Sequence, residues 1–285
     1  EKASAPAAAP SEGEARSHPL HTADTHRDDA LEFGLVIDAS YVSRSKKDEI
    51  VEHLELPGIA HGLFAPHNHN GAGHPPFNAQ NGFNFNYAEM ALRSTLSEHL
   101  DAQALFHFSE NGVGIEEAFF AAHALPYGID LKGGKFLSDF GYLNGQHHHE
   151  WSFSDMPLVY EAFLGNHGIN EIGVQLQWTA PTETYLMAGI EALQGKNESM
   201  FGHSAVTNPQ YDETDPTTGE PFLASSAAQP SLYVGYVKTG FELGSTSLLA
   251  GASWAHGNTR IDHFSDEEPY AISGKSDLFG LDLTL

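Results

Sequence analysis

The chain has 285 residues, of which 38 are acidic and 13 are basic, giving a formal net charge of -25, and it has no cysteine. This balance argues against a nucleic-acid partner, whose phosphates would be repelled, and it favours cations over anionic solutes. The lack of cysteine excludes disulfides, thiolate metal sites and thiol catalysis, so histidine and carboxylate side chains are the strong metal ligands that are left. The mean hydropathy is -0.32, and no stretch approaches the roughly 20 apolar residues of a membrane helix.

The first 29 residues are rich in Ala, Pro, Ser, Glu and His and contain almost no large apolar side chain. Such a segment cannot bury enough surface to offset its chain entropy. The chain starts at Glu1, without an initiator Met or an apolar leader, and we interpret it as a processed, secreted product. We therefore expect a disordered periplasmic tail over residues 1–29, followed by a single domain over residues 30–285.

From residue 31 onward, apolar and polar residues alternate in short stretches. In the first of them, Leu31, Phe33 and Leu35 share one face, and Glu32 and Gly34 share the other. A period of two is typical of β-strands that have one apolar and one polar face. It occurs in ten stretches: 31–41, 88–96, 102–109, 116–125, 130–137, 172–178, 185–193, 232–241, 247–256 and 276–285. Each is close to the ~9–11 residues with which a tilted strand crosses a bilayer.

The connections between these stretches alternate in length. Short ones lie near 98–101, 126–129, 180–183 and 243–246, and long ones cover 43–82, 138–168, 195–231 and 257–275, with one brief exception at 110–114. Outer-membrane barrels have short periplasmic turns and longer outer loops, whereas a soluble sandwich has no reason to sort its loops in this way. We predict an all-β fold, a transmembrane antiparallel up-and-down β-barrel of at least ten strands. Because the chain stops at Leu285 inside an alternating strand, we expect the natural protein to have further strands.

One long segment resembles a known family. The stretch from Leu131 to Gly165, LKGGKFLSDFGYLNGQHHHEWSFSDMPLVYEAFLG, is similar to the central segment of Gram-negative proteins described as zinc-regulated outer-membrane receptors or porin-like proteins. Its first part is also loosely similar to phosphate-selective porins. Supporting matches are IEEAF at 115–119 and GVQLQW at 173–178. The resemblance implies a barrel in the outer membrane of a Gram-negative bacterium and a role in metal or small-solute uptake.

The segment 142–167 combines imidazole, carboxylate and aromatic side chains, and we predict that it folds into the lumen and narrows it. Aromatic rings can pack on the barrel wall while histidines and carboxylates face the pore. The predicted constriction residues are His147, His148, His149, Glu150, Trp151, Asp155, Glu161 and His167. Such ligands suit divalent metals such as zinc, although a polar loop tip explains the histidine run as well.

A second histidine cluster lies in the first long connection and consists of His61, His67, His69 and His74. Its irregular spacing differs from that of zinc fingers and of His-Glu-x-x-His helices, so no preformed tetrahedral site follows. We predict weak metal capture here, and a flexible surface loop with neutral histidines is an equally good interpretation. None of these patterns requires a cofactor.

The function that these patterns favour is a porin-like outer-membrane channel for small solutes, including divalent metal ions such as zinc. Its expected partners are membrane lipid and the solute, and assembly into a homo-oligomer is left open. The alternative is a receptor that captures metal without conducting. We do not expect an enzyme, because no Gly-x-Ser-x-Gly elbow is present and no spacing pairs a serine with a base, which disfavours an outer-membrane hydrolase.

Overall fold

The computed structural model describes residues 31–48, 80–109, 112–153, 156–165, 167–197, 200–201, 230–263 and 270–285. The predicted tail over 1–29 lies outside these ranges. The elements are β1 (Leu31–Val42), β2 (Gly82–Ser97), β3 (Leu100–Ser109), β4 (Gly112–Leu125), β5 (Ile129–Leu137), η1 (His148–Glu150), α2 (Leu158–Leu164), β6 (Asn170–Thr179), β7 (Leu186–Leu193), β8 (Leu232–Leu243), β9 (Thr246–His263) and β10 (Tyr270–Thr284). Within the residues that the structure describes, no helix has the length and apolar character needed to span a bilayer.

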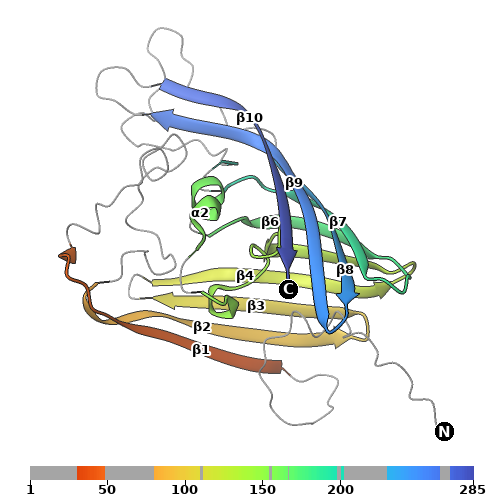
Figure 1. Cartoon of the computed structure of the whole chain (residues 1–285), viewed down its shortest axis with the longest axis horizontal. Helices are drawn as coiled ribbons and strands as arrows, with labels where there is room; N and C mark the ends of the chain where they lie inside the picture. Colours follow the sequence, from red (N-terminus) through yellow and green to blue (C-terminus); the bar gives the residue numbers. More distant parts are fainter. Residues whose placement is uncertain are drawn as a thin grey trace.

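The ten strands form one sheet in which each strand pairs with the next along the chain, from β1 to β10. All nine pairings are antiparallel. This confirms the predicted all-β class and the up-and-down order. The strands β1 and β10 form the two edges, so the sheet is open in the described residues. Figure 1 shows that the sheet curls, with β1–β4 on one arm and β8–β10 on the other.

Each of the ten predicted strands overlaps one strand of the sheet. The expected long connection over 257–275 is wrong, because β9 continues to His263 and β10 begins at Tyr270. The sequence there has few large apolar residues on either face, so its hairpin carries no hydrophobic alternation. The strand predicted at 88–96 also begins earlier, at Gly82.

The two faces of the sheet differ sharply in polarity. On the face that we call outer, large apolar side chains are exposed at alternate positions; Ile172, Val174 and Ile190 are 61%, 54% and 63% exposed. On the opposite, inner face, the polar side chains of Glu89, Gln175 and others are buried. A soluble protein shows the reverse distribution, since large exposed apolar patches are rare on soluble monomers.

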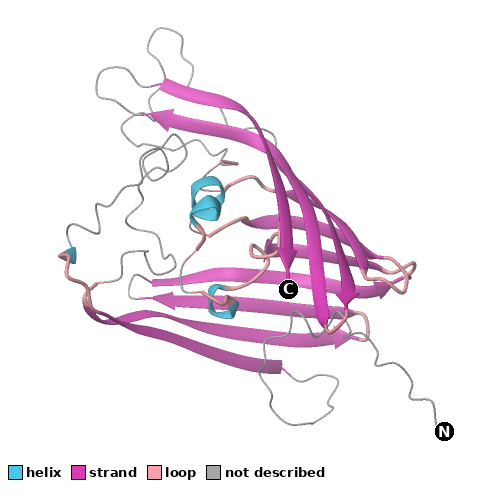
Figure 2. Ribbon diagram, in the orientation of Figure 1, coloured by secondary structure: helices cyan, strands magenta, loops and turns pink. Residues whose placement is uncertain are grey.

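The inner face is covered by the connection between β5 and β6. Figure 2 shows η1 and α2 of this connection lying between the two arms of the sheet. Its apolar side chains, including Phe140, Leu164 and Ile169, join inward-facing residues such as Met187 and Val234 in the hydrophobic core. We call residues 138–169 the inner segment.

Two glycines lie where the backbones of neighbouring strands approach closely, Gly134 next to β4 and Gly173 next to β7. Gly134 and Gly173 lie opposite each other in the register. A Cβ atom on Gly134 would lie 2.2 Å from the carbonyl oxygen of Ala118, and one on Gly173 would lie 2.4 Å from that of Ala192. Glycine is therefore required where neighbouring backbones approach so closely.

Candidate functional site

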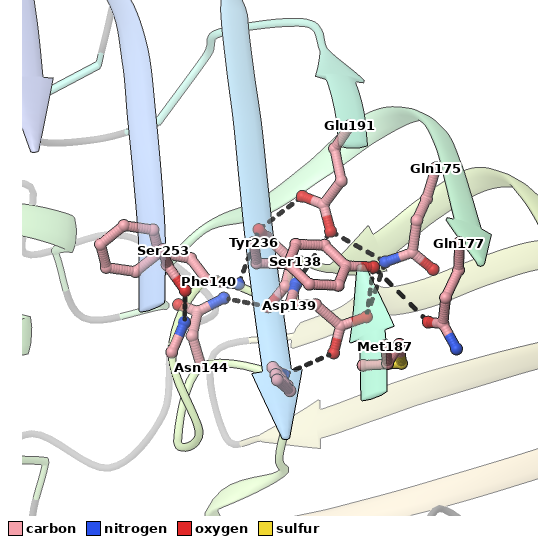
Figure 3. Close-up of polar contacts among 12 residues, drawn as sticks. Ser138, Asp139, Phe140, Asn144, Gln175, Gln177, Met187, Glu191, Tyr236 and Ser253 are labelled. Carbon is pink, nitrogen blue, oxygen red and sulfur yellow. Dashed lines mark hydrogen bonds and ion pairs between the residues drawn. The ribbon is translucent and has the colours of Figure 1, made fainter. Parts of the chain in front are cut away.

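The start of the inner segment is anchored on strands β7 and β9. The Ser138 hydroxyl donates a hydrogen bond of 2.5 Å to Glu191 Oε2, and the backbone N–H of Asp139 donates one of 2.9 Å to Glu191 Oε1 (Figure 3). The N–H of Gly141 donates to the Ser253 hydroxyl at 2.9 Å. Because these groups are buried, the bonds fix where the segment enters the concave side of the sheet.

Asp139 is the centre of this network. Its Oδ2 accepts a hydrogen bond of 2.7 Å from Gln175 Nε2 and one of 3.4 Å from the Tyr236 hydroxyl, and its Oδ1 lies 3.3 Å from Lys238 Nζ. The side chains of Asp139 and Lys238 are 2% and 9% exposed. The buried carboxylate and the buried ammonium group stabilise each other, because burying either charge without a partner costs free energy.

The two ends of the inner segment are tied to each other by Asn144. Its Nδ2 donates to the carbonyl oxygens of Ser138 and Ile169 at 2.8 and 3.1 Å, and its Oδ1 accepts from Ile169 N–H at 2.7 Å. The segment is thus a closed loop held against the inner face. This agrees with the predicted inward folding, whereas its role as a pore constriction stays a prediction.

A β-bulge in β4 creates a second polar site. The pairing with β3 passes from Leu105 opposite Glu117 to Phe106 opposite Ile115, which leaves Glu116 as the extra residue. A bulge redirects side chains that regular alternation would send to opposite faces. As a result Glu116 and Glu117, adjacent in sequence, are both buried, 8% and 6% exposed.

His147 of the inner segment lies among three carboxylates, and we call Glu89, Glu116, Glu117 and His147 the Glu–His cluster. The ring Nε2 lies 3.0 Å from Glu117 Oε2, while Nδ1 lies 3.4 Å from Glu116 Oε1 and 3.7 Å from Glu89 Oε2. All four side chains are buried. One oxygen or nitrogen from each of Glu89, Glu116 and His147 lies within 4.8 Å of the other two.

The carboxylates stabilise a positive charge on His147. Burial by itself favours the neutral ring, but the hydrogen bonds with Glu116 and Glu117 outweigh it and hold the pKa of His147 well above its ordinary value. The site therefore attracts a positive charge, whether that charge is a proton on the imidazole or a metal ion.

The other predicted site residues are spread more widely. His148 and His149 follow in η1 and are partly buried, with the His148 ring centroid 4.2 Å from that of Trp151, and Glu150 is exposed. The remaining predicted constriction residues are placed as follows: Glu161 lies in α2, His167 is partly buried near the end of the inner segment, and Asp155 lies outside the described residues. The second histidine cluster, His61, His67, His69 and His74, also lies outside them.

Several residues of the site were not among those predicted from the sequence. Asp139 and Lys238 pair across 99 positions of the chain, and no local pattern indicates such a contact. The position of Glu116 could have been predicted from the sequence. Two adjacent glutamates in an alternating strand would direct one carboxylate to the apolar face, which is costly. A bulge at this point is the simplest way to avoid that cost.

The fold and site define an all-β protein with a ten-stranded antiparallel sheet, an apolar outer face and a polar inner face that binds its own chain segment. No family model matches the chain, and no solved structure gives a significant match. The chain is 43% identical over 254 residues to an uncharacterized protein of Aquifex aeolicus (strain VF5), a match that covers 89% of this chain and 50% of that protein. The chain therefore spans about half the length of this relative.

Proposed function

We propose that the chain forms the wall of an outer-membrane β-barrel that acts as a porin-like channel for small solutes, including divalent cations, with the inner segment as its constriction. The observation that carries the proposal is the polarity of the sheet. In a bilayer, lipid would cover the outer-face side chains such as Val174 and Ile190, and water would reach the polar inner face. In an aqueous solution the same outer face would be a large apolar patch exposed to water.

Aromatic residues at the strand ends support a membrane position. Tyr127 and Trp178 flank the short turns at one end of the sheet, where Trp178 Nε1 donates a hydrogen bond of 3.1 Å to the Tyr127 carbonyl oxygen. Tyr233 lies on the outer face near the start of β8, at the end of the sheet away from these short turns, and is 47% exposed. Barrels place such rings at both membrane–water interfaces.

A channel needs a closed wall, and the edges β1 and β10 are open in the described residues. We propose that further strands pair with these edges, because unpaired backbone groups are not tolerated in contact with lipid. The relative from Aquifex aeolicus is twice as long as the matched region, which leaves room for such strands in a protein of that length.

The charges on the inner face support a preference for cations. The chain has 38 acidic and 13 basic residues, and Glu150 of the inner segment is exposed on that face. A lumen lined by one sign of charge concentrates ions of the opposite sign.

The test is conductance of the purified full chain in planar bilayers. We expect stepwise currents with a higher permeability for potassium than for chloride, and Glu150→Gln, which removes an exposed carboxylate of the inner segment, should lower that ratio. The matched control is Asp277→Asn, because Asp277 lies on the outer face next to Trp254 and His256 and should leave selectivity unchanged. A preference for chloride, or equal effects of the two variants, would contradict the proposal. Zinc binding by a folded protein that does not conduct would instead favour a metal-capturing receptor.

A further inference from the structure

We infer that the Glu–His cluster binds one divalent transition-metal ion, with Glu89, Glu116 and His147 as its protein ligands. The inference depends on the geometry of the inner face and holds whether or not the protein conducts. The site would join the inner segment, which supplies His147, to strands β2 and β4, which supply the carboxylates.

The distances between the candidate ligand atoms suit such an ion. Zinc lies about 2.0–2.2 Å from imidazole nitrogens and carboxylate oxygens, which puts neighbouring ligand atoms of a tetrahedral site roughly 3.4 Å apart. His147 Nδ1 lies 3.4 Å from Glu116 Oε1 and 3.7 Å from Glu89 Oε2. Small side-chain movements are therefore enough to bring the three ligands to one ion.

Glu117 acts on the ring from its other side. Its Oε2 lies 3.0 Å from His147 Nε2, and its Oε1 accepts a hydrogen bond of 2.8 Å from the backbone N–H of Leu137. A proton on Nε2 that is donated to Glu117 leaves the Nδ1 lone pair directed toward Glu89 and Glu116. Metal-binding histidines usually donate their second N–H to a carboxylate or carbonyl group in this way, which fixes the ring and strengthens the ligand.

The charge of the site also calls for a cation. Three buried carboxylates face the His147 ring, and the other imidazoles near them, those of His107 and His149, lie 3.9 Å from Glu116 and 3.8 Å from Glu89. Protons held within the cluster or a bound metal cation can balance this negative charge. One divalent ion would neutralise two carboxylates with every ring neutral, which relieves the cost of burying these charges.

The surroundings leave room for a further ligand. A cavity of about 20 Å³ is lined by Glu116, His147, His148 and Trp151 among others, and this is enough for one water molecule. A ligand set of imidazole and carboxylate without thiolate suits Zn²⁺, Co²⁺ or Fe²⁺, whereas Ca²⁺ and Mg²⁺ prefer oxygen ligands alone.

The experiment is a titration of the full chain in detergent micelles, first with Co²⁺ followed by visible absorption and then with Zn²⁺ followed by calorimetry. We expect one saturable site, with Zn²⁺ displacing Co²⁺ and equimolar Ca²⁺ failing to do so. His147→Ala and Glu116→Gln should abolish this binding, and Glu117→Gln should weaken it by about 10–100-fold, as the loss of a carboxylate that orients a ligand does. The same measurements on a variant with His61, His67, His69 and His74 changed to alanine should still show the site.

The inference is overturned if binding survives both His147→Ala and Glu116→Gln, if it disappears in the four-histidine variant, or if the folded wild-type chain shows no saturable site. Glu89→Gln keeps the shape of the side chain, so loss of the Co²⁺ spectrum with unchanged far-ultraviolet circular dichroism would identify ligand removal in a folded protein. Conductance is not measured in these titrations, so their failure is distinct from failure of the channel proposal.

Discussion

Replacing Gly134 with alanine is expected to destabilise the native sheet strongly, whereas the same change at the neighbouring Gly133 should be almost neutral. The backbone of Gly134 has φ of 138°, and a Cβ atom there would lie 2.2 Å from Ala118 O and 2.6 Å from Phe119 Cα. Both atoms belong to the backbone of β4, so the clash is relieved only by separating paired strands. A Cβ on Gly133 meets nothing closer than a Val174 methyl group at 3.9 Å.

We expect Gly134→Ala to lower the free energy of unfolding by more than about 4 kcal/mol, which is exceptional for a point substitution and diagnostic of backbone strain. Urea unfolding in micelles, followed by tryptophan fluorescence, measures this difference. Equal midpoints for the Gly133→Ala and Gly134→Ala variants would show that the close approach of β4 and β5 does not exist.

Asp139→Ala should release the start of the inner segment from the sheet. The substitution removes the acceptor of Gln175 and Tyr236 and leaves the Lys238 ammonium group buried without its carboxylate. Breaking one side of a buried pair typically costs about 3–5 kcal/mol. Removing a single neutral hydrogen bond, as in Ser253→Ala, should cost only about 1 kcal/mol.

A double-mutant cycle separates the loss of the Asp139–Lys238 ion pair from the cost of leaving the Lys238 ammonium group buried without a partner charge. If the cost arises from the unpaired ammonium group, adding Lys238→Met to Asp139→Ala should restore much of the stability, since coupled neighbours are not additive. Urea unfolding gives the free energies, and limited proteolysis within residues 138–169 reports release of the segment. Additive effects of the two substitutions would contradict the role assigned to this pair.

The strands were predictable because each one carries the same simple signal. Along Leu31–Tyr41 and Ile172–Trp178, apolar residues recur at every second position, and these residues lie on the outer face of the sheet. The inward folding of the inner segment was also predictable from its mixture of aromatic and ionisable residues. These features depend on local composition, which the sequence displays directly.

The contacts that define the site were not predictable in the same way. The bulge at Glu116 shifts the register by one residue, and period-two reasoning assumes that no such shift occurs. Glu89 and Glu117 fall on the inward parity, but only the three-dimensional arrangement brings His147 between them. The histidine run therefore indicated the right segment, while the sequence could not identify which of its members would be surrounded by carboxylates.

The central claim is that lipid covers the outer face of the sheet, and β2 offers the most direct test. The chain has no cysteine, so single cysteines at Met90, Ala91, Leu92 and Arg93 each carry one nitroxide label in protein reconstituted into vesicles. Met90 and Leu92 pair with the exposed outer-face residues Leu35 and Phe33. We predict that labels at 90 and 92 collide readily with oxygen and poorly with a water-soluble nickel complex. Labels at 91 and 93 should not show this preference for oxygen over the nickel complex. Equal access of the nickel complex at all four positions would contradict the account.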